Sequence, residues 1–214
     1  MIYQDVAVSA PIRQGDVFFG LPRVEVSLER IVLLEESGET SECLWRDVAQ
    51  SGREITVVLP VRPVFAIVAT QDCDAARFDD ITLCEIRGFR EVYGSARDAK
   101  TPKAWKNIIT QQARVNQKWF YLPPDPRIGF KDKMAVDFMV SLRVPRVELE
   151  AFRDLRRGRL NDVAYEHFRE RIGEFFRRYA YDEWYPLDQN ELKTYTDVYP
   201  DTEPFPWQQV AIGE

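Results

Sequence analysis

Short apolar runs separated by polar corners extend from Arg53 to Arg87, and this pattern predicts strands. Val64–Thr70 (VFAIVAT) is a continuous apolar run that begins after two prolines and ends at a polar segment. A run this short between such breakers is typical of a strand that is buried on both faces. Ile55–Leu59 and Ile81–Ile86 have the same texture. We therefore predict three strands here, with a polar corner between the last two.

Further strands are predicted on the N-terminal side of this region. Ile12–Gly20 contains a turn followed by a short apolar run, and Val24–Leu34 alternates before it becomes continuously apolar. Ser37-Gly38 is typical of a hairpin tip, after which Cys43–Val48 can return as a strand. Five or six short strands at close spacing, with no long helix between them, predict a small antiparallel barrel or curled sheet.

After Ile86 the pattern changes. Pro102 predicts the first turn of a helix that runs to about Asn116. Lys118–Leu122 (KWFYL) predicts an aromatic strand that packs in the core rather than stacking on nucleic-acid bases. Met134–Leu142 alternates and predicts the last strand of the sheet.

The C-terminal part is predicted to be helical. Pro145 begins a helix that should end at Gly158, and Asn161 or Asp162 caps a second helix. The second helix has an apolar stripe, made of Val163, Ala164, Phe168, Ile172, Phe175, Phe176 and Tyr179. The arginines of both helices are interleaved with acids, which favours an ordinary salt-bridged surface over a basic face for RNA. From Asp182 the chain is aromatic and proline-rich, and we expect this tail to lie packed along the body.

These elements predict an α+β fold in two parts that form one compact unit. Residues 1–142 supply the strands, and residues 143–214 supply the helices and the tail. With 214 residues, 45% of them hydrophobic, the chain can bury a large core. Three cysteines in no paired spacing predict a reducing compartment, and no leader or membrane-spanning pattern is seen, so we expect a cytoplasmic protein without membrane contact. The net charge of −6 opposes non-specific binding to nucleic acid.

Three short motifs resemble the beginning of MazF/PemK-type toxins. Gly15–Val17 (GDV) opens the first strand, Arg62-Pro63 leads into the apolar strand, and Leu83–Ile86 (LCEI) ends the region. The resemblance covers residues 13–87 and implies a small SH3-like antiparallel β-barrel. Residues 21–61 would then form an inserted hairpin, and the C-terminal helices would add a helical layer that the minimal toxin lacks.

The resemblance also implies an activity. Toxins of this family cleave RNA without a metal, and Arg62 matches the arginine that stabilises charge at the scissile phosphate. The family's threonine or serine falls near Arg87 here, and the nearest hydroxyls are those of Thr70 and Thr82. Cleavage through a 2′-hydroxyl needs a proton acceptor beside the cation, and the sequence does not identify one. The implied setting is a bacterial toxin–antitoxin or phage-defence system, with an antitoxin partner or a homodimer.

The polar corner after Thr70 admits three interpretations. Its candidate groups are those of Asp72, Cys73, Asp74, Asp79 and Asp80. They could present oxygens and a thiolate to a divalent cation. Asp72 and Asp74 could instead bind turn amides, with Cys73 as a small buried hydrophobe, or they could pair with Arg77 or Arg62. We favour the structural role and predict neither a metal site nor a cofactor.

Nucleic-acid contacts are expected first at Lys103, Trp105 and Lys106, together with Arg77. Lys103, Trp105 and Lys106 mix basic and aromatic side chains in a segment with few acids.

His167 is the only histidine, and it lies within a predicted helix far from the cysteines. We expect it to be a surface or helix-packing residue rather than the base of a catalytic cysteine.

Three functional hypotheses follow. The leading one is a non-catalytic or weakly catalytic binding module that contacts RNA, DNA or a partner protein through a face with Arg62, Asp72, Asp74 and Arg77. The second is a metal-independent endoribonuclease, with catalytic residues expected at Arg62, Asp72, Asp74 and Arg87. The third is a structural adaptor that docks through its aromatic tail.

Overall fold

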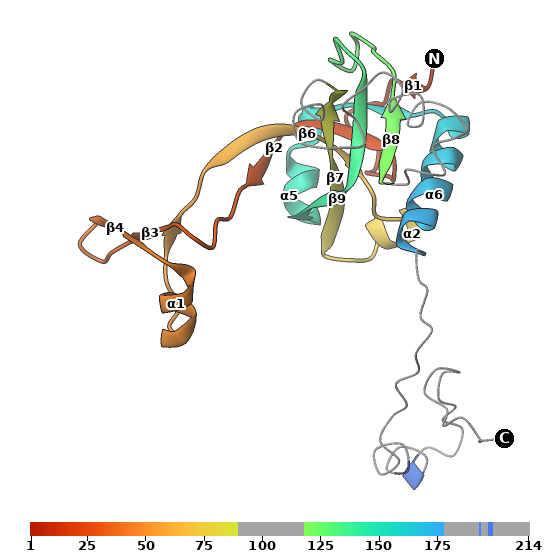
Figure 1. The fold of residues 1–214 in the computed structure, drawn as a ribbon. Coiled ribbons are helices and arrows are strands. Elements are labelled where there is room, and N and C mark those ends of the chain that lie inside the picture. Colours follow the sequence, from red (N-terminus) through yellow and green to blue (C-terminus); the bar gives the residue numbers. More distant parts are fainter. Residues whose placement is uncertain (90–117, 178–192, 194–196, 199–214) are drawn as a thin grey trace, which may run out of the picture. The chain divides into compact units, whose positions relative to one another are not determined.

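The computed structural model describes residues 1–89 and 118–177, together with residues 193, 197 and 198 (Figure 1). The chain divides into two compact units, Met1–Phe176 and Arg177–Glu214. The helix predicted from Pro102 to Asn116, and nearly all of the aromatic tail, lie outside the described residues. No helix within the described ranges has the length and hydropathy of a membrane span.

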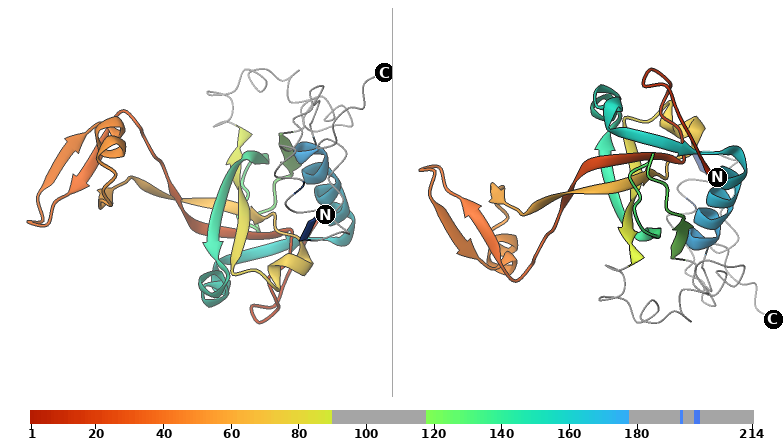
Figure 2. Two further views of the ribbon diagram at one scale, coloured as in Figure 1. Left: turned by 90° about the horizontal axis from the view of Figure 1, so that it is seen from below. Right: turned by 90° about the horizontal axis from the view of Figure 1, so that it is seen from above.

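A seven-stranded antiparallel sheet forms the body of the first unit (Figures 1 and 2). Its strand order is β1-β10-β2-β6-β7-β9-β8. The strands are β1 (Tyr3–Gln4), β2 (Asp16–Val24), β6 (Val61–Val68), β7 (Asp80–Gly88), β8 (Trp119–Leu122), β9 (Met134–Pro145) and β10 (Arg156–Leu160). The strands predicted at Val64–Thr70, Ile81–Ile86, Lys118–Leu122 and Met134–Leu142 are confirmed as β6, β7, β8 and β9.

A second sheet of three strands is inserted between β2 and β6. Its order is β4-β3-β5, and its elements are β3 (Ile31–Leu34), β4 (Thr40–Cys43), α1 (Trp45–Ser51) and β5 (Val57–Val58). β2 and β6 lead into it as a paired ribbon whose last partners are Val24 and Val61 (Figure 2). We call residues Val24–Val61 the arm. The hairpin tip predicted at Ser37-Gly38 is confirmed, since the Glu35 N–H donates to the Glu39 carbonyl across it.

Two predictions for the arm are wrong. The strand predicted over Cys43–Val48 does not form, because β4 ends at Cys43 and α1 begins at Trp45. Gly52, with φ 62°, ends that helix in the left-handed conformation that glycine adopts without strain. The doubly buried strand predicted over Ile55–Leu59 is reduced to β5, a short strand at the edge of the small sheet.

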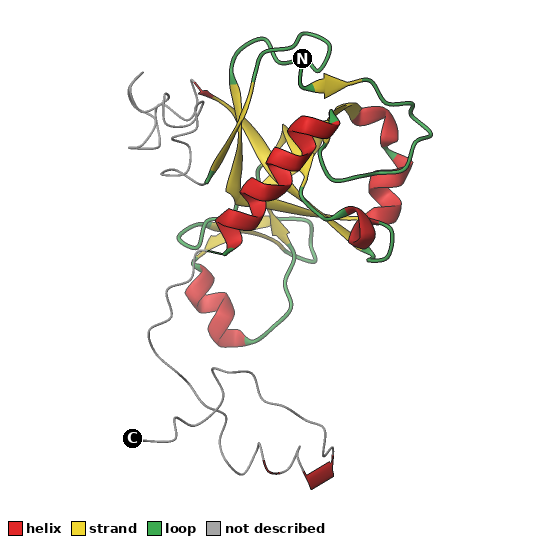
Figure 3. Cartoon of the chain, turned by 90° about the vertical axis from the view of Figure 1, so that its right-hand side faces the viewer, coloured by secondary structure: helices red, strands yellow, loops and turns green. Residues whose placement is uncertain are grey.

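Helices cover both faces of the seven-stranded sheet, which explains the continuous apolar runs of its central strands. The helices of the body are α2 (Asp72–Ala75), α5 (Arg146–Ala151), the 3₁₀ helix η3 (Arg153–Leu155) and α6 (Asp162–Phe176). On one face Ile67 packs in a cluster with Phe168 and Ile172 of α6, which crosses the sheet in Figure 3. On the other face Ala66 packs in a cluster with Leu149 of α5.

The helix α6 agrees with its prediction, and the helix before it does not. Asn161 caps α6, because its Oδ1 accepts the N–H of Ala164 at 3.0 Å. The helix predicted from Pro145 ends at Ala151 instead of Gly158, since residues 156–160 form β10. The stripe on α6 is buried at Ala164, Phe168 and Ile172, half-buried at Phe175 and exposed at Val163 and Phe176. Tyr179 lies outside the described residues.

A buried ion cluster explains why β10 is a strand. Asp16 is fully buried at the start of β2, and its carboxylate accepts hydrogen bonds from Arg156 (Nη1, 2.9 Å) and Arg159 (Nη2, 3.0 Å). Arg156 also donates to four carbonyls in the N-terminal segment that precedes β2, those of Ala7, Val8, Ala10 and Pro11. Gly158 lies between the two arginines, where a Cβ atom would collide with Ile128. The cluster therefore joins the N-terminal segment, β2 and β10.

The seven-stranded sheet is open, because its edge strands β1 and β8 do not pair with each other. The two edges are nevertheless connected. The Tyr3 hydroxyl of β1 donates to the carbonyl of Pro123, just after β8, at 2.9 Å. The Tyr3 ring also contacts Phe130 edge to face, with centroids 5.9 Å apart. The predicted α+β class is confirmed, whereas the SH3-like barrel stays a prediction.

We expect Asp16→Asn to lower the free energy of unfolding by about 3–5 kcal/mol, because it leaves Arg156 and Arg159 buried without a counter-charge. Urea denaturation followed by circular dichroism measures this loss. Asp154→Asn, at an exposed position in η3, is the matched control and should stay within about 0.5 kcal/mol of the wild type. An Asp16→Asn protein as stable as this control would contradict a structural role for the cluster.

Candidate functional site

The structure does not gather the predicted binding face in one place. Arg62 lies at the start of β6, opposite Arg23 of β2, whereas Asp72 and Asp74 follow the other end of β6. An eight-residue strand separates them, which is roughly 26 Å of extended chain. The ion pair considered between Arg62 and Asp72 or Asp74 is therefore wrong.

Arg62 binds a buried carboxylate that the sequence analysis did not select. Glu85 of β7 is 2% exposed, and its Oε1 lies 2.6 Å from Nη2 of Arg62. Its Oε2 lies 3.4 Å from Nε of Arg23. Arg62 also donates to Glu25 at 3.2 Å. The Arg62 guanidinium, which the toxin resemblance assigns to a phosphate, is thus shared between two carboxylates. The hydrogen bond to Glu85 and the charge of Glu85 both raise the pKa of Arg62.

Arg87 belongs to the same group of side chains. It lies 3.6 Å from Asp137 of β9, which is buried and stands directly opposite Glu85 in the strand register. Burial raises the pKa of Asp137 above its ordinary value, although the Met139 N–H and Arg87 oppose this shift. We call Arg23, Arg62, Glu85, Arg87 and Asp137 the arginine–carboxylate cluster. Arg62 and Arg87, both predicted as catalytic residues, therefore lie in one cluster, each beside a buried acid.

Asp72 has a structural role. It begins α2, and its carboxylate accepts hydrogen bonds from Arg13 (Nη2, 2.7 Å) and from the N–H of Gln14 (2.8 Å). The Tyr165 hydroxyl of α6 donates to it at 3.4 Å. These contacts connect α2, α6 and the turn before β2. The interpretation that Asp72 binds turn amides is confirmed.

The rest of the acidic corner is organised by α2. Cys73 is exposed, so its predicted burial is wrong; the chain turns into a helix here and directs this side chain outward. Asp72 and Asp74 are two positions apart in the helix and therefore do not share a face. Arg77 is exposed just beyond α2. In the part of the chain that the structure describes, no three His, Cys, Asp or Glu residues are grouped to hold a metal ion.

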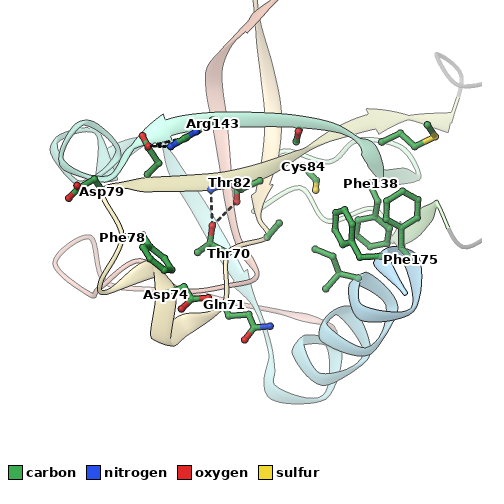
Figure 4. A pocket seen from close by; sticks show the side chains of 16 residues that line it. Thr70, Gln71, Asp74, Phe78, Asp79, Thr82, Cys84, Phe138, Arg143 and Phe175 are labelled. Atoms are coloured by element: carbon green, nitrogen blue, oxygen red, sulfur yellow. Dashed lines mark hydrogen bonds and ion pairs between the residues drawn. The ribbon is translucent and has the colours of Figure 1, made fainter. Parts of the chain in front are cut away.

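A groove of about 900 Å³ lies next to this corner, between the β7–β9 surface and the helices α2 and α6 (Figure 4). One end is acidic, with Asp74, Asp79 and Asp80 in its lining, and the Arg143 guanidinium there donates to Asp80 at 2.9 Å. The other end is apolar and aromatic. It is lined by Phe138, Met139, Ile172, Phe175 and Phe176.

Thr70 and Cys84 are two of the residues that line the groove. The Thr70 Oγ1 accepts the N–H of Thr82 at 2.7 Å and so fastens the end of β6 to β7 (Figure 4). Burial, together with the charge of Asp137, raises the pKa of Cys84 to about 12, so its thiol stays protonated near neutral pH. His167 is exposed on α6, as predicted.

Three large apolar side chains at the groove are exposed to solvent. The exposed fractions are 58% for Phe78 near the acidic end, and 70% for Met139 and 58% for Phe176 at the aromatic end. The Phe138 and Phe175 rings, which also line the groove, pack with a centroid distance of 5.5 Å. A concave surface with exposed aromatic groups next to acids is typical of a site for a ligand or partner.

The remaining predicted nucleic-acid contacts cannot be placed. Lys103, Trp105 and Lys106 lie outside the described residues. The aromatic strand β8 agrees with the core-packing interpretation at Trp119, which is 1% exposed. Residues of the groove such as Ser141 and Arg143 were not selected from the sequence, because their proximity to β7 follows from its pairing with β9.

No protein-family model matches the chain, and no curated protein matches it either. The relation to MazF/PemK-type toxins therefore stays a prediction.

We expect the buried Asp137 to make the protein less stable as pH rises. Its pKa is raised in the folded state, so the folded protein holds this proton when the unfolded chain has released it. The Asp137 carboxyl contributes its full stabilisation below the ordinary aspartate pKa of about 4, and this contribution is lost as pH rises through the pKa of Asp137 in the folded state. The free energy of unfolding of Asp137→Asn, measured relative to that of the wild type, should therefore increase from pH 4 to pH 8. Urea denaturation across this range measures the difference, and parallel curves would contradict it.

Proposed function

We propose that this protein is a binding module whose groove receives an extended segment of a partner protein. The observation that carries the proposal is the joining of an acidic end and an aromatic end in one groove. The sequence analysis also favoured a binding module, but it placed the contact face around Arg62. We propose the groove beside α2 and α6 as the contact face instead.

The charge of the groove favours a protein partner over RNA or DNA. Its acidic end has three carboxylates, and its one arginine in the lining, Arg143, is bonded to Asp80. Nucleic acid binds through cations that neutralise its phosphates, and the described lining offers an excess of negative charge instead. A lysine or arginine side chain of a partner would be attracted to Asp74 and Asp79.

The aromatic end would contact large apolar residues of the partner segment. Phe176 and Met139 are exposed there, and the rings of Phe138 and Phe175 in the same lining pack against each other. Aromatic and methionine side chains are the groups that interfaces enrich, because they bury a large area on binding. The proposed segment therefore carries a basic residue followed by large apolar residues.

The endoribonuclease hypothesis is the second candidate, and one observation favours it. Glu85 lies 2.6 Å from Arg62, so a proton acceptor stands beside the expected cation. Two features weigh against it. Glu85 is held by a second guanidinium, that of Arg23, and Arg62 is already neutralised by two acids, Glu85 and Glu25.

Several expectations stay predictions under this proposal. They are the SH3-like barrel, the toxin–antitoxin or phage-defence setting, the homodimer and the cytoplasmic location. An adaptor role through the aromatic tail would be compatible with a protein-binding groove.

Selection of a random-peptide phage library on the purified full chain tests the proposal. We expect enriched peptides to combine lysine or arginine with a nearby aromatic or leucine residue. Binding of such a peptide, measured by fluorescence anisotropy, should weaken roughly tenfold in the double variant Asp74→Asn/Asp79→Asn, which removes two charges. Phe176→Ala should weaken it as well.

The matched control is Asp154→Asn, which removes an exposed acid that is not part of the groove lining. It should bind the selected peptide like the wild type. Selected peptides without a shared basic and apolar pattern, or an affinity that the groove variants leave unchanged, would refute the proposal.

A further inference from the structure

The arm exposes an unusual amount of apolar surface. Its 38 residues, from Val24 to Val61, are all described. Eight large hydrophobic side chains of the arm are exposed, with fractions between 37% and 66%: Val24, Val26, Leu28, Leu34, Leu44, Trp45, Val58 and Val61. Solvent-exposed apolar groups that are concentrated in one segment mark an interaction surface.

The arm has almost no core of its own. Within it, Ile31 and Val48 are the buried hydrophobic residues. On the small sheet Val32 pairs with Val58, and Leu34 lies two positions along β3, so these three side chains share one face. Leu34 is 42% exposed and Val58 is 49% exposed. This face therefore remains open to solvent, whereas a small sheet needs a covered apolar face for its stability.

The arm also carries nearly the whole net charge of the protein. Between Val24 and Val61 there are eight carboxylates and three arginines, a net charge of −5, against −6 for the full chain. Two of these acids have arginine partners: Glu42 binds Arg30, and Glu25 binds Arg62. The six other acids are all exposed, at Glu29, Glu35, Glu36, Glu39, Asp47 and Glu54.

We propose that the arm is a docking element for a second protein surface, one that is basic around an apolar centre. Charge complementarity selects this occupant. A second copy of the chain would bring another arm of charge −5, and like charges across an interface are unfavourable. Nucleic acid and anionic lipid are disfavoured for the same reason. Trp45, which is 41% exposed at the start of α1, adds a large apolar side chain of the kind that interfaces use as anchors.

This inference goes beyond the proposed function, because the arm and the groove have no residue in common. The groove lining consists of residues between Ala69 and Phe176, all outside the arm. Variants of one surface therefore leave the other intact, and the two proposals can fail separately.

The experiment measures the affinity of the full chain for a defined probe, a labelled helical peptide with a leucine face and a lysine face. A second peptide has the same composition in an order that forms no apolar face, and a third replaces lysine by glutamate. We expect the first peptide to bind, with an affinity that falls as salt is added. We expect at least roughly tenfold weaker binding of the other two.

Two variants of the arm separate its apolar and charged contributions. Leu34→Ser/Val58→Ser keeps every charge and should weaken binding of the first peptide roughly tenfold. Glu35→Gln/Glu36→Gln/Glu39→Gln should weaken binding and reduce its dependence on salt. Val147→Ser, at a position 67% exposed on α5, is the matched apolar control and should bind like the wild type. The groove variant Asp74→Asn/Asp79→Asn should also bind like the wild type.

Three results would overturn the proposal. They are no binding of the first peptide, equal binding of the first and second peptides, and binding that neither arm variant changes. Light scattering on the purified protein adds a fourth: a dimer that Leu34→Ser/Val58→Ser converts to a monomer would show that a second copy covers the arm.

Discussion

The buried carboxylate of Asp16 is the constraint on which the rest of the body depends. It neutralises Arg156 and Arg159 and so holds β10 against β2. Because β10 leads directly into α6, the cluster also places one wall of the groove. The Arg13 N–H donates to Asp16 while the Arg13 side chain binds Asp72 at the start of α2. Both helical walls of the groove are therefore tied to this one acid.

The surfaces of the protein differ in how their charges are used. In the arginine–carboxylate cluster each cation lies beside a buried acid, so the group that the toxin resemblance would assign to phosphate chemistry is neutralised. The groove and the arm instead combine exposed apolar groups with unneutralised carboxylates. Both surfaces suit basic, partly apolar protein segments, and both repel polyanions. Taken together, the two proposals describe a protein that joins two partners.

The sequence predicts those elements whose signal is local. β6 and β7 follow from short apolar runs, and α6 follows from its cap at Asn161 and its apolar stripe. β10 has a polar sequence, RRGRL, and is a strand because Asp16, far away in the chain, binds its arginines. Single acids within apolar strands, Glu85 and Asp137, could have been selected from the sequence. Their arginine partners and the groove could not, because both depend on strand register, including a bulge between Cys84 and Glu85.

Hydrogen–deuterium exchange of the full chain tests the central claim most directly, with a phage-selected basic peptide in one sample and single-stranded RNA in another. Exchange reports local protection of backbone amides. The account predicts that the peptide protects amides between Thr70 and Asp80 and at the aromatic end of the groove, near Phe138 and Phe175. It also predicts that RNA protects neither region and stays intact. Protection by RNA around Arg62 and Glu85, or cleavage of that RNA in the presence of EDTA, would contradict a protein-binding groove as the working site.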